Sequence, residues 1–92
     1  MHTINYIKNF SEIINMQAEY KLIYKLEEKA STYILTIIKV EKNKSKQIAC
    51  EPYNVTFDEA KNILKFLYEN NISLENLVDI LTDYDIAFRV IK

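Results

Sequence analysis

Hydrophobic residues near the start of the chain recur at intervals of three and four positions. Ile4, Ile7, Phe10 and Ile14 follow this spacing between residues 3 and 16, and polar residues, several of them asparagines, lie between them. Such spacing places apolar side chains on one face of an α-helix. The pattern therefore predicts an amphipathic helix at the N-terminus.

The pattern then changes to alternation, which is typical of β-strands. From residue 20 to residue 27, large apolar residues alternate with mostly charged ones, which predicts a half-buried strand followed by a turn at 28–31. Residues 33–40 are largely apolar on both faces and rich in β-branched residues, as in a strand at the centre of a sheet. A polar turn is expected at residues 41–46, where Asn43 is able to supply the left-handed backbone conformation that glycine usually provides.

A third strand of the same meander is expected at about residues 47–51. It is short, and it is followed by Pro52, whose nitrogen has no hydrogen to donate to a neighbouring strand. We therefore expect this strand to lie at an edge of the sheet.

Two helices are expected after the strands. Thr56 and Glu59 have the spacing of a capping box, in which each side chain bonds the backbone N–H of the other residue. This helix ends at Asn70–Asn71, because asparagine can replace glycine after a helix, and Ser73 is a candidate cap for the second helix. Residues 85–92 alternate and predict a short final strand, with an extension of the second helix as the alternative.

Strands that precede helices along the chain indicate an α+β fold in a single domain of 92 residues. The expected organisation is an N-terminal helix (1–18), a three-stranded antiparallel β-meander (19–52), a helical hairpin packed on one face of the sheet (55–84) and a tail (85–92). No apolar run approaches the ~20 residues of a membrane span, so we expect no contact with a membrane.

The chain contains no glycine, and this excludes several classes of site. Phosphate-binding loops, dinucleotide-binding fingerprints and nucleophile elbows all depend on glycine. His2 is the only histidine and Cys50 the only cysteine. Acid–base catalysis, thiolate chemistry and metal binding each need fixed partners for such residues. We therefore expect no enzymatic activity, no cofactor and no metal, with His2 as a solvent-exposed bystander.

We expect Cys50 to be a small buried hydrophobic residue. A single cysteine cannot form an internal disulfide, which favours a reducing compartment. The first residues do not form a basic segment followed by an apolar block, as a signal peptide would. Together these features predict a cytoplasmic protein.

Charge is distributed unevenly although the net charge is −1. Residues 20–50 contain seven Lys and three Glu, whereas residues 51–85 contain two Lys and eight acidic residues. Carboxylates four positions apart on the second helix lie on one face. With one more beside them they form the first candidate surface, the acidic row: Glu75, Asp79, Asp83 and Asp85. This row either meets a basic groove on a partner or is an ordinary solvated helix face.

The lysines around the second expected turn form another candidate surface, which we call the basic hairpin: Lys39, Lys42, Lys44 and Lys46. Lysines with tyrosines nearby can bind nucleic acid, but arginine, which reads bases better, occurs once. Lysines also keep the edges of sheets from aggregating. A third alternative is self-association, in which this basic surface meets the acidic row of a second copy.

Three tyrosines of the expected meander are aromatic candidates for partner binding: Tyr20, Tyr24 and Tyr33. Tyrosine is frequent at interfaces because it buries a ring while its hydroxyl stays hydrated. It is equally common as a partly buried core residue, and both interpretations stay open.

One longer pattern combines these features. A lysine-rich meander is followed by the segments Asn54–Ala60 and Asn70–Leu77, which carry the two helix starts. On these segments, residues 20–84 resemble a family of small proteins of unknown function from low-GC Gram-positive bacteria. The resemblance implies a meander with a helical hairpin and a chromosomal or phage-borne accessory role. The abundance of Ile, Asn and Lys indicates an A/T-rich gene, as such genomes have.

We expect a small non-catalytic protein that binds a larger protein and occludes part of its surface. The most concrete version is a phage or mobile-element inhibitor of a bacterial defence nuclease, of the anti-CRISPR type, because the acidic row can compete with nucleic acid for a basic groove. An alternative is a chromosomal accessory or regulatory protein that acts as a homodimer. A third is a weak nucleic-acid binder that uses the basic hairpin.

Overall fold

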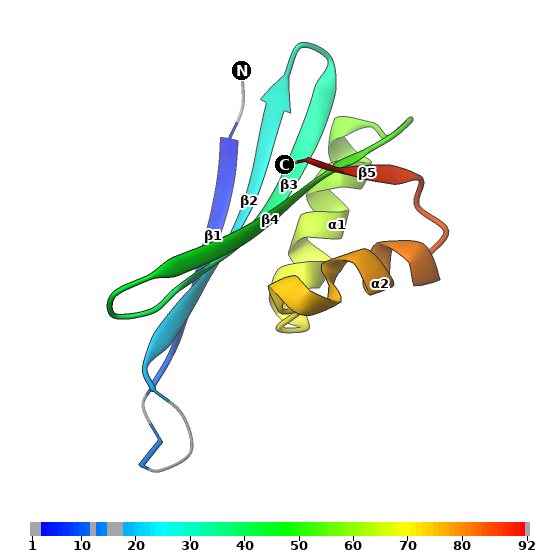
Figure 1. The fold of residues 1–92 in the computed structure, drawn as a ribbon. Coiled ribbons are helices and arrows are strands. Elements are labelled where there is room, and N and C mark those ends of the chain that lie inside the picture. The colour runs from blue at the N-terminus through cyan, green and yellow to red at the C-terminus, as the bar shows by residue number, and fades with distance from the viewer. Residues whose placement is uncertain (1–2, 12, 15–17, 92) are drawn as a thin grey trace.

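The computed structural model describes residues 3–11, 13–14 and 18–91, which form one five-stranded antiparallel sheet with helices on one face (Figure 1). The strands lie in the sheet in the order in which they occur in the sequence. They are β1 (Thr3–Phe10), β2 (Tyr20–Lys29), β3 (Thr32–Val40), β4 (Ser45–Pro52) and β5 (Phe88–Ile91). Between β4 and β5 lie the helix α1 (Phe57–Glu69), the short 3-10 helix η1 (Leu74–Asn76) and the helix α2 (Leu77–Asp83).

The N-terminal segment is a strand, so the predicted N-terminal helix is wrong. β1 pairs with β2 along its whole length, from Thr3 opposite Glu27 to Phe10 opposite Tyr20. The remainder of the predicted helix includes residues 12, 15 and 16, which lie outside the described residues. The expected fold class is therefore wrong as well: the molecule is mainly an antiparallel sheet, with two short helices that follow four of its strands.

The spacing of apolar residues predicted a helix wrongly because β1 carries a lysine, Lys8, at an inward position. Alternate residues of β1 are half-buried under the helices, namely Ile4, Tyr6, Lys8 and Phe10. An apolar residue at position 8 would have displayed a strand-like alternation in the sequence. The ammonium of Lys8 instead lies 4.3 Å from the ring centroid of Tyr68 on α1, and the long aliphatic stem lets this lysine occupy an inward position.

β4 lies inside the sheet, so its predicted edge position is wrong. It pairs with β3 on one side and with β5 on the other. Pro52 is compatible with this position because it is the last residue of the strand, opposite Phe88. The next residue restores the ladder, since the N–H of Tyr53 donates to the carbonyl of Ala87 at 2.8 Å.

The two hairpin turns are built without glycine. Ala30 and Ser31 join β2 to β3 with φ angles of 44° and 71°, as the favoured two-residue hairpin turn requires. In the β3–β4 turn the N–H of Glu41 donates to the carbonyl of Lys44 at 2.8 Å. Asn43 in this turn does not have a positive φ angle, so the left-handed conformation predicted for it is wrong.

The predicted start and end of α1 are confirmed, whereas the predicted Ser73 cap of the second helix is wrong, because Ser73 precedes a 3-10 turn and α2 begins at Leu77 with Asn76 as its N-cap. The N–H of Thr56 donates to the carboxylate of Glu59 at 2.8 Å, and the N–H of Glu59 donates to the hydroxyl of Thr56 at 3.1 Å. α1 stops where Asn71 adopts a φ angle of 52°, and α2 stops where Asp85 adopts 57°. After each helix, backbone N–H groups turn back to the carbonyls of its last turn, as in a Schellman motif. At the N-cap of η1, Ser73 makes no side-chain capping bond.

The core lies between one face of the sheet and the helices. It consists of Leu22, Tyr24, Leu26, Leu35, Ile37, Cys50, Ala60, Leu64, Leu67, Leu77 and Leu81. Tyr24 is fully buried, and its hydroxyl donates to the carbonyl of Ile72 at 2.9 Å. Burial, together with the nearby Tyr20, raises the pKa of Tyr24 from 10.0 to about 12. The phenol therefore acts as a neutral donor that links the sheet to the segment after α1.

The chain ends in a strand, as the alternation of its last residues predicts. β5 pairs antiparallel with β4, and Arg89 lies opposite Glu51 on the face that the helices leave uncovered. The Nε of Arg89 lies 2.5 Å from a carboxylate oxygen of Glu51. Glu51 is only 8 % exposed, so this ion pair fastens the last strand to a largely buried carboxylate.

Candidate interaction surfaces

The acidic row lies on η1, α2 and the turn that follows them. Glu75 belongs to η1, Asp79 and Asp83 belong to α2, and Asp85 is the residue with a positive φ angle after α2. All four side chains are exposed. Asp79 in the first turn of α2 faces the positive end of the helix dipole, whereas Asp83 lies at the negative end. The dipole of α2 thus favours the charge of Asp79 and disfavours that of Asp83.

Glu75 is the member of the acidic row whose charge interacts with lysines of the sheet. Its pKa is lowered first by a hydrogen bond from its own backbone N–H and then by one from the Ser73 hydroxyl. The charges of Lys39 and Lys46 lower it further. The acidic row and the basic hairpin therefore meet inside one molecule at η1, and they offset part of each other's charge there.

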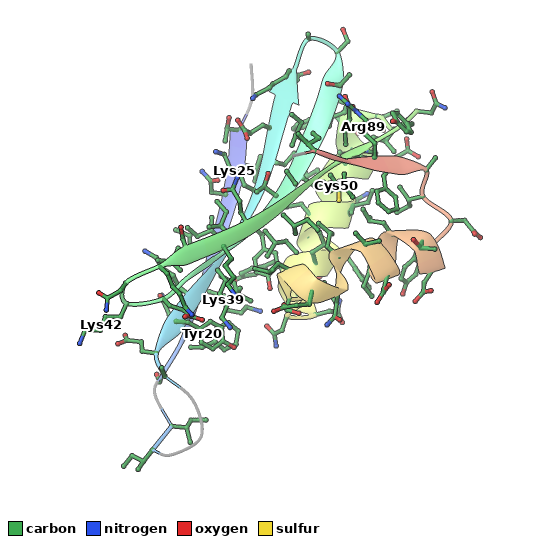
Figure 2. The ribbon with its side chains drawn as sticks, in the orientation of Figure 1. Tyr20, Lys25, Lys39, Lys42, Cys50 and Arg89 are labelled. Atoms are coloured by element: carbon green, nitrogen blue, oxygen red, sulfur yellow. The ribbon has the colours of Figure 1, made fainter. Side chains whose placement is uncertain are left out.

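A second carboxylate, that of Glu41, offsets part of the positive charge of the basic hairpin at its turn. Glu41 lies 3.4 Å from the ammonium of Lys39 and 3.4 Å from that of Lys44. Partial desolvation raises the pKa of Glu41, but the hydrogen bonds from these lysines outweigh it, and the net shift is downward. Lys39 also lies over the ring of Tyr20, 4.7 Å from its centroid, whereas Lys42 projects from the tip of the hairpin (Figure 2).

An open hollow of about 600 Å³ lies beside this turn. It is formed where the start of β2 approaches the β3–β4 turn, and its walls include Tyr20, Glu41, Lys42 and Lys44. Its walls carry both ammonium and carboxylate groups, with Lys21 and Glu19 among them. A wall of mixed sign does not concentrate the positive potential that a phosphate ligand needs.

The three candidate tyrosines differ in exposure. Tyr24 is fully buried in the core, so it has no ring surface to offer a partner. Tyr20 is half-buried and stacks on Phe10 with ring centroids 4.7 Å apart. Tyr33 is half-buried against Phe57, at 6.1 Å. All three are thus engaged within the sheet or with α1, and their core interpretation fits the structure better than the interface interpretation.

The exposed aromatic residue beside the acidic row is Tyr84, which sequence reasoning did not select. Its side chain is 60 % exposed, and its ring contacts Phe66 edge-on at a centroid distance of 5.3 Å. It is the C-cap of α2 and lies between Asp83 and Asp85 in the sequence. The sequence did offer a signal for its exposure, namely the place of Tyr84 between two aspartates at the expected end of the second helix.

Cys50 is confirmed as a buried residue. It has no exposed surface, and it lies on β4 between Leu35 of β3 and Val90 of β5 (Figure 2). Burial raises the pKa of its thiol, which is the opposite of what a thiolate nucleophile needs. His2 lies outside the described residues, and residues 3–11, 13–14 and 18–91 contain no cluster of three or more metal-ligating side chains.

The chain matches no protein-family model, and comparisons with curated proteins and with solved structures find no significant match either. None of the helices in the described ranges is long and apolar enough to cross a membrane. The resemblance to small proteins of low-GC bacteria stays a prediction.

Proposed function

We propose that the protein is a non-catalytic, cytoplasmic binding module whose contact face is the acidic row together with Tyr84. The observation that carries this proposal is the exposure of all four carboxylates beside a tyrosine that is 60 % exposed. Tyrosine is frequent at interfaces because a partner can bury its ring while the hydroxyl stays hydrated, and a row of carboxylates selects a partner with a basic surface. Binding there occludes that surface.

The basic hairpin supports direct nucleic-acid binding less well. Two of its lysines share Glu41, and two contribute to the field around Glu75. The single arginine of the chain pairs with Glu51 on the uncovered face of the sheet. Few cations therefore remain free to neutralise phosphates, and the acidic row repels a nucleic acid that approaches the helices.

The most concrete version of the proposal is inhibition of a bacterial defence nuclease by a phage or mobile-element protein. A groove that binds nucleic-acid phosphates is basic, and the acidic row competes for it. The test mixes the purified protein with a panel of CRISPR nucleases and follows complex formation by gel filtration and DNA cleavage in parallel. A stable complex with loss of cleavage supports this version; free elution from every nuclease with unchanged cleavage contradicts it.

The contact face is tested with any partner that binds. Asp79→Asn with Asp83→Asn is expected to weaken the complex at least tenfold and to reduce its dependence on salt, because both charges leave the face. The matched control, Asp58→Asn with Glu69→Gln, removes two carboxylates from α1 and is expected to bind like the wild type. Equal losses in both variants would show that net charge, and not this face, determines binding.

Direct nucleic-acid binding gives a different result in the same assays. Affinity for DNA or RNA would fall steeply with salt and would weaken when Lys42, Lys44 and Lys46 become Ala. The proposal expects no such binding at physiological ionic strength. Tight, salt-sensitive binding to DNA or RNA that these three substitutions abolish would replace it.

A further inference from the structure

The outer edge of β1 is less protected than the other edge of the sheet. β1 and β5 are the two edge strands. β5 is only four residues long, and short edge strands resist pairing with another chain. β1 has eight residues, no proline, and an unbroken register with β2. Regular edges of this kind are templates for a further strand.

The single charged residue of β1 does not protect this edge against pairing with another strand. Lys8 is the one charged residue of the strand. Its ammonium donates to the carbonyl of Tyr68 at 2.7 Å and to the side-chain oxygen of Asn71 at 2.6 Å. It is therefore already directed at the end of α1, on the covered face of the sheet. An incoming strand at the β1 edge would meet uncharged side chains and would not need to desolvate a free ammonium.

Isoleucines on the uncovered face form a row that ends at this edge. Ile38 lies opposite Ile23, and Ile23 lies opposite Ile7. The two inner side chains are half-buried, whereas Ile7 is 53 % exposed. A strand that brings another isoleucine beside Ile7 would continue the row and bury apolar surface that the single chain leaves in water.

We propose that two copies of the protein pair antiparallel along β1, with Ile7 on the two-fold axis opposite Ile7 of the second copy. In this register Asn5 lies opposite Asn9 and Tyr6 lies opposite Lys8, so each face of the sheet stays continuous. The two sheets join into one, and the isoleucine row crosses from Ile38 of one copy to Ile38 of the other. α1 packs mainly over β2 and β3, and its last turn reaches β1, where the carbonyl of Tyr68 accepts a hydrogen bond from Lys8.

Neighbouring registers are less complementary. With Tyr6 on the axis, Ile7 would lie opposite Asn5, and the isoleucine row would stop. With Lys8 on the axis, two ammonium groups would face each other, and like charges directly opposite destabilise a strand pair. The sequence of β1 therefore favours the Ile7 register.

A second copy is also a better occupant than β5 of a neighbouring molecule. Pairing of β1 with β5 would leave one free edge at each end and would generate an open polymer, whereas a two-fold β1 pair closes on itself. The four-residue length of β5 also disfavours the open arrangement.

The first test measures the mass of the wild type by light scattering during gel filtration, from low to high micromolar concentration. We expect twice the mass of one chain at the higher concentrations. Ile7→Lys places two ammonium groups on the axis and is expected to abolish the dimer over this range. Val90→Lys adds the same charge to the other edge strand, at a side chain of similar exposure (44 %), and is expected to stay dimeric. Circular dichroism establishes that both variants are folded.

The second test fixes the register with single cysteines. Antiparallel partners have Cα atoms about 4.5–5.5 Å apart, which lies within the range of a disulfide. Ile7→Cys is therefore expected to form a covalent dimer on mild oxidation. Asn5→Cys, on the same face of β1, is expected to stay uncrosslinked, because its counterpart lies opposite Asn9 and roughly 13 Å away. The wild type controls for Cys50, which is buried.

Three results would overturn the proposal. The first is a wild type that remains monomeric at every concentration. The second is a dimer that survives Ile7→Lys but is lost in Val90→Lys, which would assign pairing to β5. The third is crosslinking by Asn5→Cys without crosslinking by Ile7→Cys, which would assign another register.

Discussion

At the scale of single residues, the chain places residues other than glycine at its positive φ angles. In the described ranges, these angles occur at Ala30, Ser31, Asn54, Asn71 and Asp85. Asparagine and aspartate adopt this conformation at modest cost because their side chains bond the local backbone, whereas alanine and serine gain less or nothing. The β2–β3 turn is therefore the place where the absence of glycine costs the most stability.

Ser31→Gly is expected to raise the free energy of unfolding by about 0.5–1 kcal/mol. Relief of the left-handed strain exceeds the entropy that a glycine loses on folding. Urea denaturation followed by circular dichroism measures the change. Ala87→Gly serves as the control, because Ala87 does not have a positive φ angle, and it is expected to lower stability slightly. Equal shifts in both variants would contradict the strain at Ser31.

At the scale of elements, the sequence predicts a segment well when its signal is local. The capping box at Thr56, the end of α1 at Asn71 and the alternation of β2 depend on neighbouring residues, and the structure confirms them. Burial of Cys50 follows from residue type. The site is less predictable: the acidic row is exposed as a helix surface should be, but burial of Tyr24 and exposure of Tyr84 depend on which residues α1 and α2 cover.

β1 shows that contacts with residues distant in the sequence can decide a secondary structure that the local pattern leaves ambiguous. Its apolar residues fit two periodicities, and the choice between them is made by β2, which offers a complete edge, and by α1, which accepts Lys8. α1 has no basic residue in its own last turn, so the negative end of its dipole is free to bind a cation from elsewhere. The strand supplies it across 60 residues of sequence.

Lys8→Met should show how much this cation contributes. Methionine keeps the apolar stem but removes both hydrogen bonds to the end of α1, and we expect the free energy of unfolding to fall by about 1–2 kcal/mol. Hydrogen exchange should accelerate most at the amides of residues 66–72. Lys21→Met removes a lysine from β2 and is expected to change stability by less than about 0.5 kcal/mol. Equal effects of the two variants would argue against a capping role.

The attachment of β5 should depend on acid. The hydrogen bond from Arg89 is the main cause of the lowered pKa of Glu51, which has an ordinary value of 4.5. A carboxyl whose pKa is lower in the folded state stabilises the fold above its unfolded pKa, and this contribution is lost as the pH falls through the folded pKa. In urea titrations, Glu51→Gln should therefore be less stable than the wild type at neutral pH and should approach it in acid. A gap that is constant with pH would show that the charge of Glu51 is unimportant.

At the scale of the whole molecule, two asymmetries organise the surface. The acidic row and the basic hairpin divide the charge between the helices and one end of the sheet, and they meet at Glu75. The helices cover one face of the sheet and leave the other open, with Ile7 and Arg89 at opposite edges of it. A small domain with a free edge, an open face and a charged helix has several surfaces available for association, and none of them requires a catalytic group.

The four-residue strand β5 completes the sheet. The reactivity of Cys50 on the neighbouring strand β4 should show whether β5 is paired. Cys50 lies beside Val90 of β5 and has no exposed surface, so we expect a thiol reagent to reach it only when β5 or the whole domain opens. In native buffer we expect Cys50 to be labelled far more slowly than in urea-unfolded protein.

Arg89→Met removes the ion pair with Glu51 and should release β5 locally. We expect labelling of Cys50 to accelerate at least tenfold and to lose its dependence on low concentrations of denaturant, since opening one strand exposes little surface. Lys25→Met breaks an ion pair within β2, in which the Lys25 ammonium lies 3.5 Å from the Glu27 carboxylate, and should leave the labelling rate near that of the wild type. Fast labelling of the wild type would mean that β5 does not close the sheet, because a thiol between two paired strands cannot react while both ladders are intact.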